Sequence, residues 1–448
     1  MFVRLPSIRV LGLAGLLLLT AGCERNFMEV RPPIRVVEPD LTLVQPGRSL
    51  DLTLETPDFL TALTVNDVPF ERNPQTRYWV GTVPLERGLN RLVIHGFDGA
   101  REAATDTVLA AHLPVQVTSI GVPPLPVPRG GHATTRLLDG RLLLTGGAPS
   151  TSASPRPEAL LFDPVRLRFE VLDQPMIAAR MGHTATLLPD GRVLILGGHR
   201  TPDVSRIDDL VETAEVFDPR TQTFRRVPVE GAPIRRFWHT AAIRPGAGGA
   251  LLVDLYGGRG DVRYGPTPRL GTRSDLRTLR FRNDSLFADD GGLGFAIQPV
   301  SGHTQTPLDT TLPGASRRFL VTGSYFFAPD AFESVSFTLD VSGPAPALQD
   351  AAALREGRTR HAAALLRSNL VLISGGHRDT PETATNTTEL YFADVRRFFL
   401  LPPDDNAPLK RFGHTATHVG PTRLLVIGGF DPRGHGRTTS EYIDVGLF

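Results

Sequence analysis

One module recurs along the last two thirds of the chain and constrains its fold more than any other feature. It reads arginine, two residues, histidine, an apolar run, a tight turn, a second apolar run and a Gly-Gly pair. Two looser copies start at His239 and His303, and four clean copies place the first glycine 14 residues after the histidine: His132 to Gly146, His183 to Gly197, His361 to Gly375 and His414 to Gly428. A period of roughly fifty residues predicts a propeller or an array, because one such unit cannot bury its apolar face alone.

Each copy predicts four strands. Asp139-Gly140 and Asp190-Gly191 separate apolar runs and favour hairpins, because both residue types tolerate positive φ. The best copies continue with a third and a fourth strand, marked by two aromatic residues seven apart: Phe162 and Phe169, Phe217 and Phe224, and Tyr391 and Phe398. Four antiparallel strands make one propeller blade, so six copies predict six blades.

The double glycine after the second strand and the spaced aromatic pair resemble the kelch repeat. This resemblance implies an all-β fold, with a six-bladed kelch-type β-propeller over residues 113–448. Phenylalanine replaces the tyrosine or tryptophan of that family at most aromatic positions. Galactose oxidase is an enzyme on this scaffold, but it depends on copper and on a tyrosine cross-linked to a cysteine. The single cysteine here is Cys23, so the resemblance implies the scaffold and no cofactor.

The last copy reaches only a third strand, at 440–445, before the sequence ends at Phe448. An unpaired strand edge favours aggregation, so a ring of sheets should be closed. We therefore expect residues 115–121, just before the first copy, to supply the missing strand.

The first residues carry two arginines, an apolar core and small residues before Cys23, which is the layout of a secretory signal. The stretch LTAGC resembles the bacterial lipobox, which implies removal of residues 1–22 and lipidation of Cys23. Residue 24 is glutamate, not the aspartate that retains many Gram-negative lipoproteins at the inner membrane. The expected location is the bacterial outer membrane, with the N-terminal lipid as anchor. The alternative is an uncleaved anchor helix with an incidental cysteine.

Two further segments precede the propeller. Residues 23–34 are polar and contain proline, which suits a lipidated tether. Residues 35–112 alternate apolar and polar residues in about seven short runs, which indicates an antiparallel β-sandwich. The corner formed by Leu85, Gly88 and Asn90 resembles that of bacterial immunoglobulin-like domains. Trp79 is expected in its core, and the domain is expected to act as a spacer.

The charge balance excludes nucleic acid as a partner. The chain has a formal charge of +1, and removing residues 1–22 takes away Arg4 and Arg9 and no acid. A near-neutral mature chain has no electrostatic basis for binding polyanions.

The repeated histidines and glycines are expected to be structural. A histidine at the start of each inner strand can bond a neighbouring backbone carbonyl and fix the register between blades. Metal ligands must converge at about two ångströms, and repeats around a ring lie further apart, so we expect no metal site. This structural set comprises His132, His183, His239, His303, His361 and His414, with Gly146, Gly147, Gly197, Gly198, Gly257, Gly258, Gly375, Gly376, Gly428 and Gly429.

Binding is expected in the loops, because loops carry function on rigid scaffolds. The segments after each Gly-Gly pair and those entering each module should emerge on one face of the ring. A solvated, charge-balanced rim is one interpretation of their composition. The other is a binding face for a protein or glycan partner, with Arg200, Arg259, Arg263, Tyr264, His377, Arg378 and Arg433 as contacts.

The sequence therefore predicts a lipid-anchored envelope protein that binds or scaffolds a partner without catalysis. The alternative is a carbohydrate-active enzyme of the glycosidase kind, with its acids in the irregular third and fourth blades. That alternative would use Asp289, Asp290, His303 and Asp309. Paired carboxylates about 5 to 9.5 Å apart in a deep central pocket would favour it.

Overall fold

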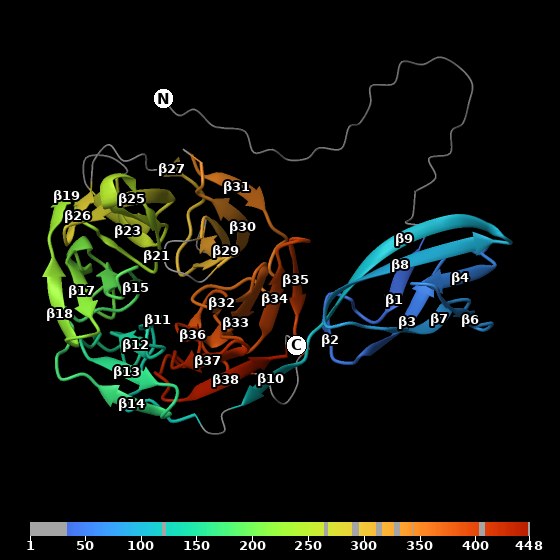
Figure 1. Cartoon of the computed structure of the whole chain (residues 1–448), viewed down its shortest axis with the longest axis horizontal. Helices are drawn as coiled ribbons and strands as arrows, with labels where there is room; N and C mark the ends of the chain where they lie inside the picture. The colour runs from blue at the N-terminus through green and yellow to red at the C-terminus, as the bar shows by residue number, and fades with distance from the viewer. Residues whose placement is uncertain are drawn as a thin grey trace, which may run out of the picture.

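The computed structural model describes residues 34–118, 122–263, 268–288, 295–310, 316–326, 332–343, 345–402 and 408–446. A small two-sheet unit lies beside a ring of sheets (Figure 1). Within the described residues, three 3-10 helices occur, at Ile207–Asp209, Ala247–Gly249 and Pro381–Thr383. No helix of these residues is long and apolar enough to cross a membrane. The predicted signal peptide and Cys23 lie outside the described residues.

The N-terminal unit consists of two sheets that share one apolar core. Trp79 is buried in that core and donates its ring N–H to Thr56, so its predicted core role is confirmed. The described part of this unit has nine strands, where the sequence predicted seven. One sheet comprises β1 (Arg35–Glu38), β3 (Ser49–Glu55), β7 (Trp79–Pro84) and β6 (Glu71–Arg72). The other comprises β2 (Val44–Gln45), β9 (Arg101–His112), β8 (Gly88–Asp98), β4 (Ala62–Val65) and β5 (Val68–Pro69).

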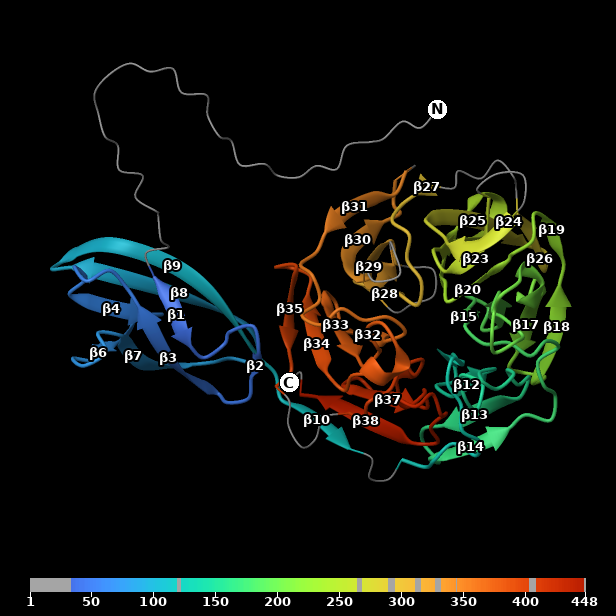
Figure 2. The same ribbon diagram turned by 180° about the vertical axis from the view of Figure 1, so that it is seen from behind.

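Six sheets stand around a central axis and form the blades of a propeller (Figure 2). Blade 1 comprises β11 (Ala133–Arg136), β12 (Leu142–Thr145), β13 (Ala159–Asp163) and β14 (Arg168–Val171). Blade 2 comprises β15 (Thr184–Leu187), β16 (Val193–Leu196), β17 (Ala214–Asp218) and β18 (Thr223–Val227). Blade 4 comprises β28 (Thr304–Pro307), β29 (Arg318–Phe326), β30 (Phe332–Asp340) and β31 (Ala347–Asp350). Blade 5 comprises β32 (Ala362–Arg367), β33 (Leu370–Ser374), β34 (Thr388–Phe392) and β35 (Arg397–Leu400).

Blade 3 is larger than the others. It comprises β21 (Thr240–Pro245), β22 (Leu251–Tyr256), β25 (Asp275–Arg282) and β26 (Ser285–Ala288), extended by β19 (Val229–Gly231) and β27 (Phe295–Ala296). The segment at 259–275, expected to be a loop, instead forms a hairpin of β23 (Arg259–Arg263) and β24 (Pro268–Thr272), which pairs with β20 (Arg236–Phe237). Three residues of this added sheet, Arg259, Gly271 and Thr272, line the candidate site described below.

Local sequence signals account for the regular blades. The aromatic residues seven apart face each other across the outer two strands of a blade. The ring centroids are 4.7 Å apart for Phe162 and Phe169, and 4.9 Å apart for Phe217 and Phe224. Tyr391 and Phe398 form the same pair in blade 5 at 4.7 Å. The predicted third and fourth strands are confirmed in these three blades.

The two ends of the ring meet in blade 6. This blade comprises β36 (Thr415–His418), β37 (Arg423–Ile427), β38 (Ser440–Val445) and, as its outer strand, β10 (Val115–Thr118). Val115 pairs with Val445, and Val117 pairs with Ile443. Ring closure by the strand that precedes the first copy is therefore confirmed for residues 115–118. Residues 119–121 lie outside the described part.

The N-terminal unit packs against the outer parts of blades 5 and 6. Val44, Ala111 and Leu113 share a core with residues of both blades, including Phe399 and Val445. Where the chain enters this interface, the backbone N–H of Leu400 also donates to the Thr42 carbonyl at 2.9 Å. The small unit is thus joined to the ring by buried apolar contacts as well as by the connecting chain.

The first glycine of each Gly-Gly pair allows neighbouring blades to approach. Gly146 has a φ of +62°, and a Cβ at this position would lie 2.3 Å from the Arg180 carbonyl oxygen of the next blade. The equivalent distance at Gly197 is 2.4 Å, to the carbonyl oxygen of Arg236. Gly140 has a φ of +89° in the blade 1 hairpin, and a Cβ there would meet nothing within 4 Å.

These two glycines make a matched pair of substitutions. Gly146→Ala and Gly140→Ala both place an alanine in the left-handed region, at about 1–2 kcal/mol each. Only Gly146→Ala also forces two blades apart, so we expect it to lower the free energy of unfolding by at least about 2 kcal/mol more than Gly140→Ala. Urea unfolding of both variants measures the difference. Equal losses would contradict close blade contact at Gly146.

Candidate functional site

A closed ring of backbone hydrogen bonds surrounds the central axis. Each of the six modules contributes the residue directly before its histidine, and the N–H of this residue donates to the carbonyl of the equivalent residue in the preceding blade at 2.6 to 2.9 Å. The ring runs through Gly131, Gly182, Trp238, Gly302, Arg360 and Gly413, and the N–H of Gly131 closes it on Gly413. All six residues have a φ between +51° and +67°.

The six module histidines directly follow the residues of this backbone ring and form a layer next to it. Together with Trp238 and Arg360 they enclose a cavity of about 110 Å³. Most of them contact the preceding blade through a threonine hydroxyl: His183 Nε2 lies 2.9 Å from Thr145 Oγ1, and His361 Nε2 lies 3.0 Å from Thr304 Oγ1. The sequence had suggested a backbone carbonyl as the partner, and the hydroxyl replaces it. Each such bond joins two blades.

Burial sets the charge of these histidines. It lowers the pKa of His132 and of His303 to about 3, and it lowers the pKa of His183, His239, His361 and His414 well below the usual value. The imidazoles are therefore neutral at neutral pH. No group of three or more histidine, cysteine, aspartate or glutamate side chains in the described part of the chain is arranged to hold a metal ion.

The module arginines are buried and extend away from the axis. Arg358 is fully buried, and its guanidinium donates to the Gly375 carbonyl at 2.9 Å and to Glu389 at 2.7 Å. Arg180 with Glu215 and Arg411 with Glu441 repeat this arrangement. The glutamate also accepts backbone N–H groups of the segment entering the module, as Glu389 does from Arg355 at 2.8 Å. This network fixes each Gly-Gly turn to its own blade.

The segments entering the modules and those following the Gly-Gly pairs lie side by side, as predicted. Backbone bridges join Met181 to His199, Thr359 to His377 and Phe412 to Phe430. We call this side of the ring the Gly-Gly face. It carries the predicted binding residues that the structure describes.

A polar pocket of about 360 Å³ opens on the Gly-Gly face. It lies between the β23–β24 hairpin and blades 4 and 5, and its lining is Arg259, Gly271, Thr272, Ser301, Ser324, Thr359, Arg360, His377 and Asp379. We call it the Gly-Gly-face pocket. Arg259 stacks over Phe237 with 5.8 Å from guanidinium to ring centroid, and Arg360 stacks over Trp238 at 4.8 Å. In the described part of the chain, neither guanidinium has a hydrogen bond or an ion pair.

The predicted partner-binding residues divide into those that the pocket gathers and those that it does not. Arg259 and His377 line it. Arg378 is exposed at the rim and pairs with Asp379 at 3.5 Å, while Arg200 donates to the Leu210 carbonyl within its own loop. Arg433 is exposed in the blade 6 loop and does not line the pocket. Arg263 belongs to β23, its side chain is outside the description, and Tyr264 lies outside the described residues.

Arg360 is the pocket residue that the sequence analysis missed, although the sequence contains a signal for it. The residue before the module histidine is glycine in four copies, but it is Trp238 in RFWH and Arg360 in RTRH. These two exceptions to the repeat stack on each other at the axis. Ser324, where the repeat loses its second glycine, also lines the pocket.

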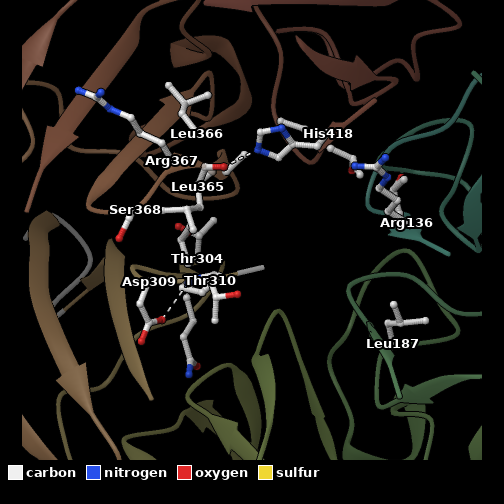
Figure 3. Close-up of a pocket in the computed structure, with 18 of the residues that line it drawn as sticks. Arg136, Leu187, Thr304, Asp309, Thr310, Leu365, Leu366, Arg367, Ser368 and His418 are labelled. Atoms are coloured by element: carbon white, nitrogen blue, oxygen red, sulfur yellow. Dashed lines mark hydrogen bonds between the residues drawn. The ribbon is translucent and has the colours of Figure 1, made fainter. Parts of the chain in front are cut away.

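The opposite end of the axis opens into a larger cavity of about 1070 Å³, which we call the hairpin mouth. Figure 3 shows its lining, with Arg136 and Leu187 across the opening from Leu365, and with His418 reaching the Leu365 carbonyl. Asp309 is the one carboxylate among the described residues of this lining, and it accepts hydrogen bonds from Ser316 and Thr310.

The structure brings together two of the residues proposed for the glycosidase alternative. His303 and Asp309 both line the hairpin mouth, although His303 is buried in the histidine layer. Asp289 and Asp290 lie outside the described residues. A second carboxylate is needed for acid and base roles at one glycosidic bond, and the described lining of the hairpin mouth supplies one.

Comparison with known proteins identifies the fold. No family model matches the chain, and no curated protein matches it. Among solved structures, that of YjhT is similar with a TM-score of 0.52 and 13% identity, over 72% of this chain and 99% of that chain. A copper complex of a fungal alcohol oxidase of the AA5 family has a TM-score of 0.47 and 14% identity, over 92% of this chain and 74% of that chain. The ring is a kelch-type β-propeller, and likeness at such identity shows the fold alone.

Proposed function

We propose that this protein is a lipid-anchored binding or scaffolding protein of the bacterial envelope, which holds a protein or glycan partner on the Gly-Gly face without catalysis. One observation carries the proposal: the Gly-Gly-face pocket contains two guanidinium groups, Arg259 and Arg360, that have no ion pair in the described part of the chain. Arginine side chains that a fold leaves without an anion are suited to bind one from outside.

The N-terminal segments support the location in the envelope. The lipobox-like LTAGC at 19–23 would place a lipid on Cys23, and residues 24–34 would act as the tether. Glu24 stands where an aspartate would signal inner-membrane retention, which supports sorting to the outer membrane. The two-sheet unit over 35–112 would be an immunoglobulin-like spacer, in which Asn90 closes the corner by bonding the backbone N–H and carbonyl of Glu86, both at 2.8 Å.

Capture from a solubilised envelope extract tests this function. The bait is the mature chain with Cys23→Ser, which removes the lipid. We expect Arg259→Ala, Arg378→Ala and Arg433→Ala together to reduce capture of the partner at least tenfold, because these exposed arginines come from three blades of the Gly-Gly face. A matched bait carries Arg136→Ala and Arg367→Ala, two exposed arginines of the hairpin mouth, and should capture normally.

Comparing capture by the two variants shows which face of the ring binds the partner. Normal capture by the triple variant would contradict binding on the Gly-Gly face. Loss of capture in the hairpin-mouth variant alone would assign the partner to the opposite opening.

A further inference from the structure

We propose that the Gly-Gly-face pocket binds an acidic saccharide, whose carboxylate is held by Arg259 and Arg360. This inference rests on the proposed binding function and names the chemical class of its ligand. It is carried by three features of the pocket: the backbone position of Arg360, the lack of a partner for its charge, and the hydroxyl groups around it.

Arg360 occupies a position that the fold itself reserves for glycine. Four of the six equivalent residues in the backbone ring are glycine, because all six have positive φ. A side chain in this region costs about 1–2 kcal/mol, and such residues concentrate at functional sites. Glycine could form the same backbone hydrogen bonds without strain. The arginine side chain is therefore kept at the axis despite an unfavourable backbone conformation.

No carboxylate of the described residues forms an ion pair with Arg360. Its guanidinium lies over Trp238, a cation–π contact that leaves its N–H groups free to donate in the plane of the group. Burial and the nearby charge of Arg259 lower the pKa of Arg360 to about 10, so it stays protonated at neutral pH. Two guanidinium groups close enough to repel each other are stabilised when one carboxylate bridges them.

The rest of the lining suits a ligand that carries hydroxyl groups. Hydroxyls of Thr272, Ser301, Ser324 and Thr359 surround the pocket. Ser324 Oγ and both ring nitrogens of His377 are buried without a hydrogen-bond partner in the described protein. Burial lowers the pKa of His377 to about 3, so its neutral ring offers one donor and one acceptor.

The charge balance at the rim favours a single acid group over a polyanion. Asp379 is exposed there, and its carboxylate pairs with Arg378. A ligand with several negative groups would meet this carboxylate, whereas one carboxylate directed at Arg259 and Arg360 would not. The pocket volume of about 360 Å³ is within the range of small-ligand sites.

Glucuronic acid and glucose are the probes, because they differ in the carboxylate alone. We measure their binding to the delipidated mature chain by isothermal titration calorimetry. Glucuronic acid should bind at least tenfold more tightly than glucose, and Arg360→Gly should remove this preference. Arg360→Gly retains the fold, since glycine occupies four equivalent positions, and a thermal melt verifies this. Arg259→Ala is the second test variant.

Arg206→Ala is the matched control, because it removes an exposed arginine from the loop after Gly197-Gly198, outside the pocket and outside the proposed contacts. It should leave the affinity for glucuronic acid within twofold of the unmodified chain. Equal affinity for the acid and the neutral sugar would overturn the inference, as would an equal loss in Arg206→Ala and Arg360→Gly. Inorganic sulfate binding as tightly as glucuronic acid would overturn the saccharide assignment. If glucuronic acid fails to bind while envelope capture persists, the binding function stands and the acidic class is wrong.

Discussion

Lowering the pH from 7.5 to 5.5 should reduce the free energy of unfolding on the order of 8 kcal/mol, through the six module histidines alone. Each is buried with its folded-state pKa far below the 6.5 of an unfolded chain. Below pH 6.5 the unfolded chain therefore binds protons that the folded protein excludes. Stability is complete above pH 6.5 and is lost progressively as the pH falls toward about 3.

Urea unfolding at pH 7.5, 6.5 and 5.5 measures this loss. Since a domain has about 5–15 kcal/mol of stability in total, the protein should be close to unfolding at pH 5.5. His361→Gln should reduce the loss between pH 7.5 and 5.5 by about one sixth, because it removes one of six titrating groups. The matched change is His435→Gln, which removes an exposed histidine outside the buried layer. A free energy of unfolding that is the same at pH 7.5 and 5.5 would contradict the neutral histidine layer.

Glu389→Ala should lower the free energy of unfolding by about 3–5 kcal/mol, because it removes the carboxylate 2.7 Å from the buried guanidinium of Arg358 and leaves only Glu356, which is 3.7 Å away and partly exposed. The substitution also removes the acceptor of the N–H groups of Arg355 and Glu356. The side chains of Arg358 and Glu389 are at most 1% exposed, so water cannot replace the missing group.

Asp58→Ala is the control for this substitution. Asp58 forms ion pairs with Arg72 and Arg77 in the N-terminal unit, but its side chain is 70% exposed. Exposed pairs contribute less than about 1 kcal/mol, so urea unfolding should separate the two variants clearly. Similar losses in both would show that water reaches the Arg358 network.

The sequence predicted the blades well because their signals are local. The spacing from His132 to Gly146 reflects one hairpin, and the spacing from Phe162 to Phe169 reflects one strand pair, so each can be inferred without the rest of the molecule. Closure of the ring by residues 115–118 could be predicted because an unpaired strand edge favours aggregation in any sheet.

The pocket was harder to predict because its residues come together only in the folded ring. Arg259 and His377 were predicted because they lie in segments expected to be loops. Arg360 lies inside the repeated module, directly before its histidine, where four of the six copies have glycine. Arg259 and Arg360 are about a hundred residues apart, and the β23–β24 hairpin that brings them together was expected to be a loop. The partner glutamates, such as Glu389, were also missed, although glutamate recurs at the same place in AEVF, TELY and SEYI.

The position of the N-terminal unit leaves both openings of the ring accessible. Views from opposite sides show this unit beside the ring and not across either face (Figures 1 and 2). Its shared core with blades 5 and 6 attaches it to the circumference. A partner bound on the Gly-Gly face would therefore leave the hairpin mouth free for a second molecule, so the protein could hold two partners at once.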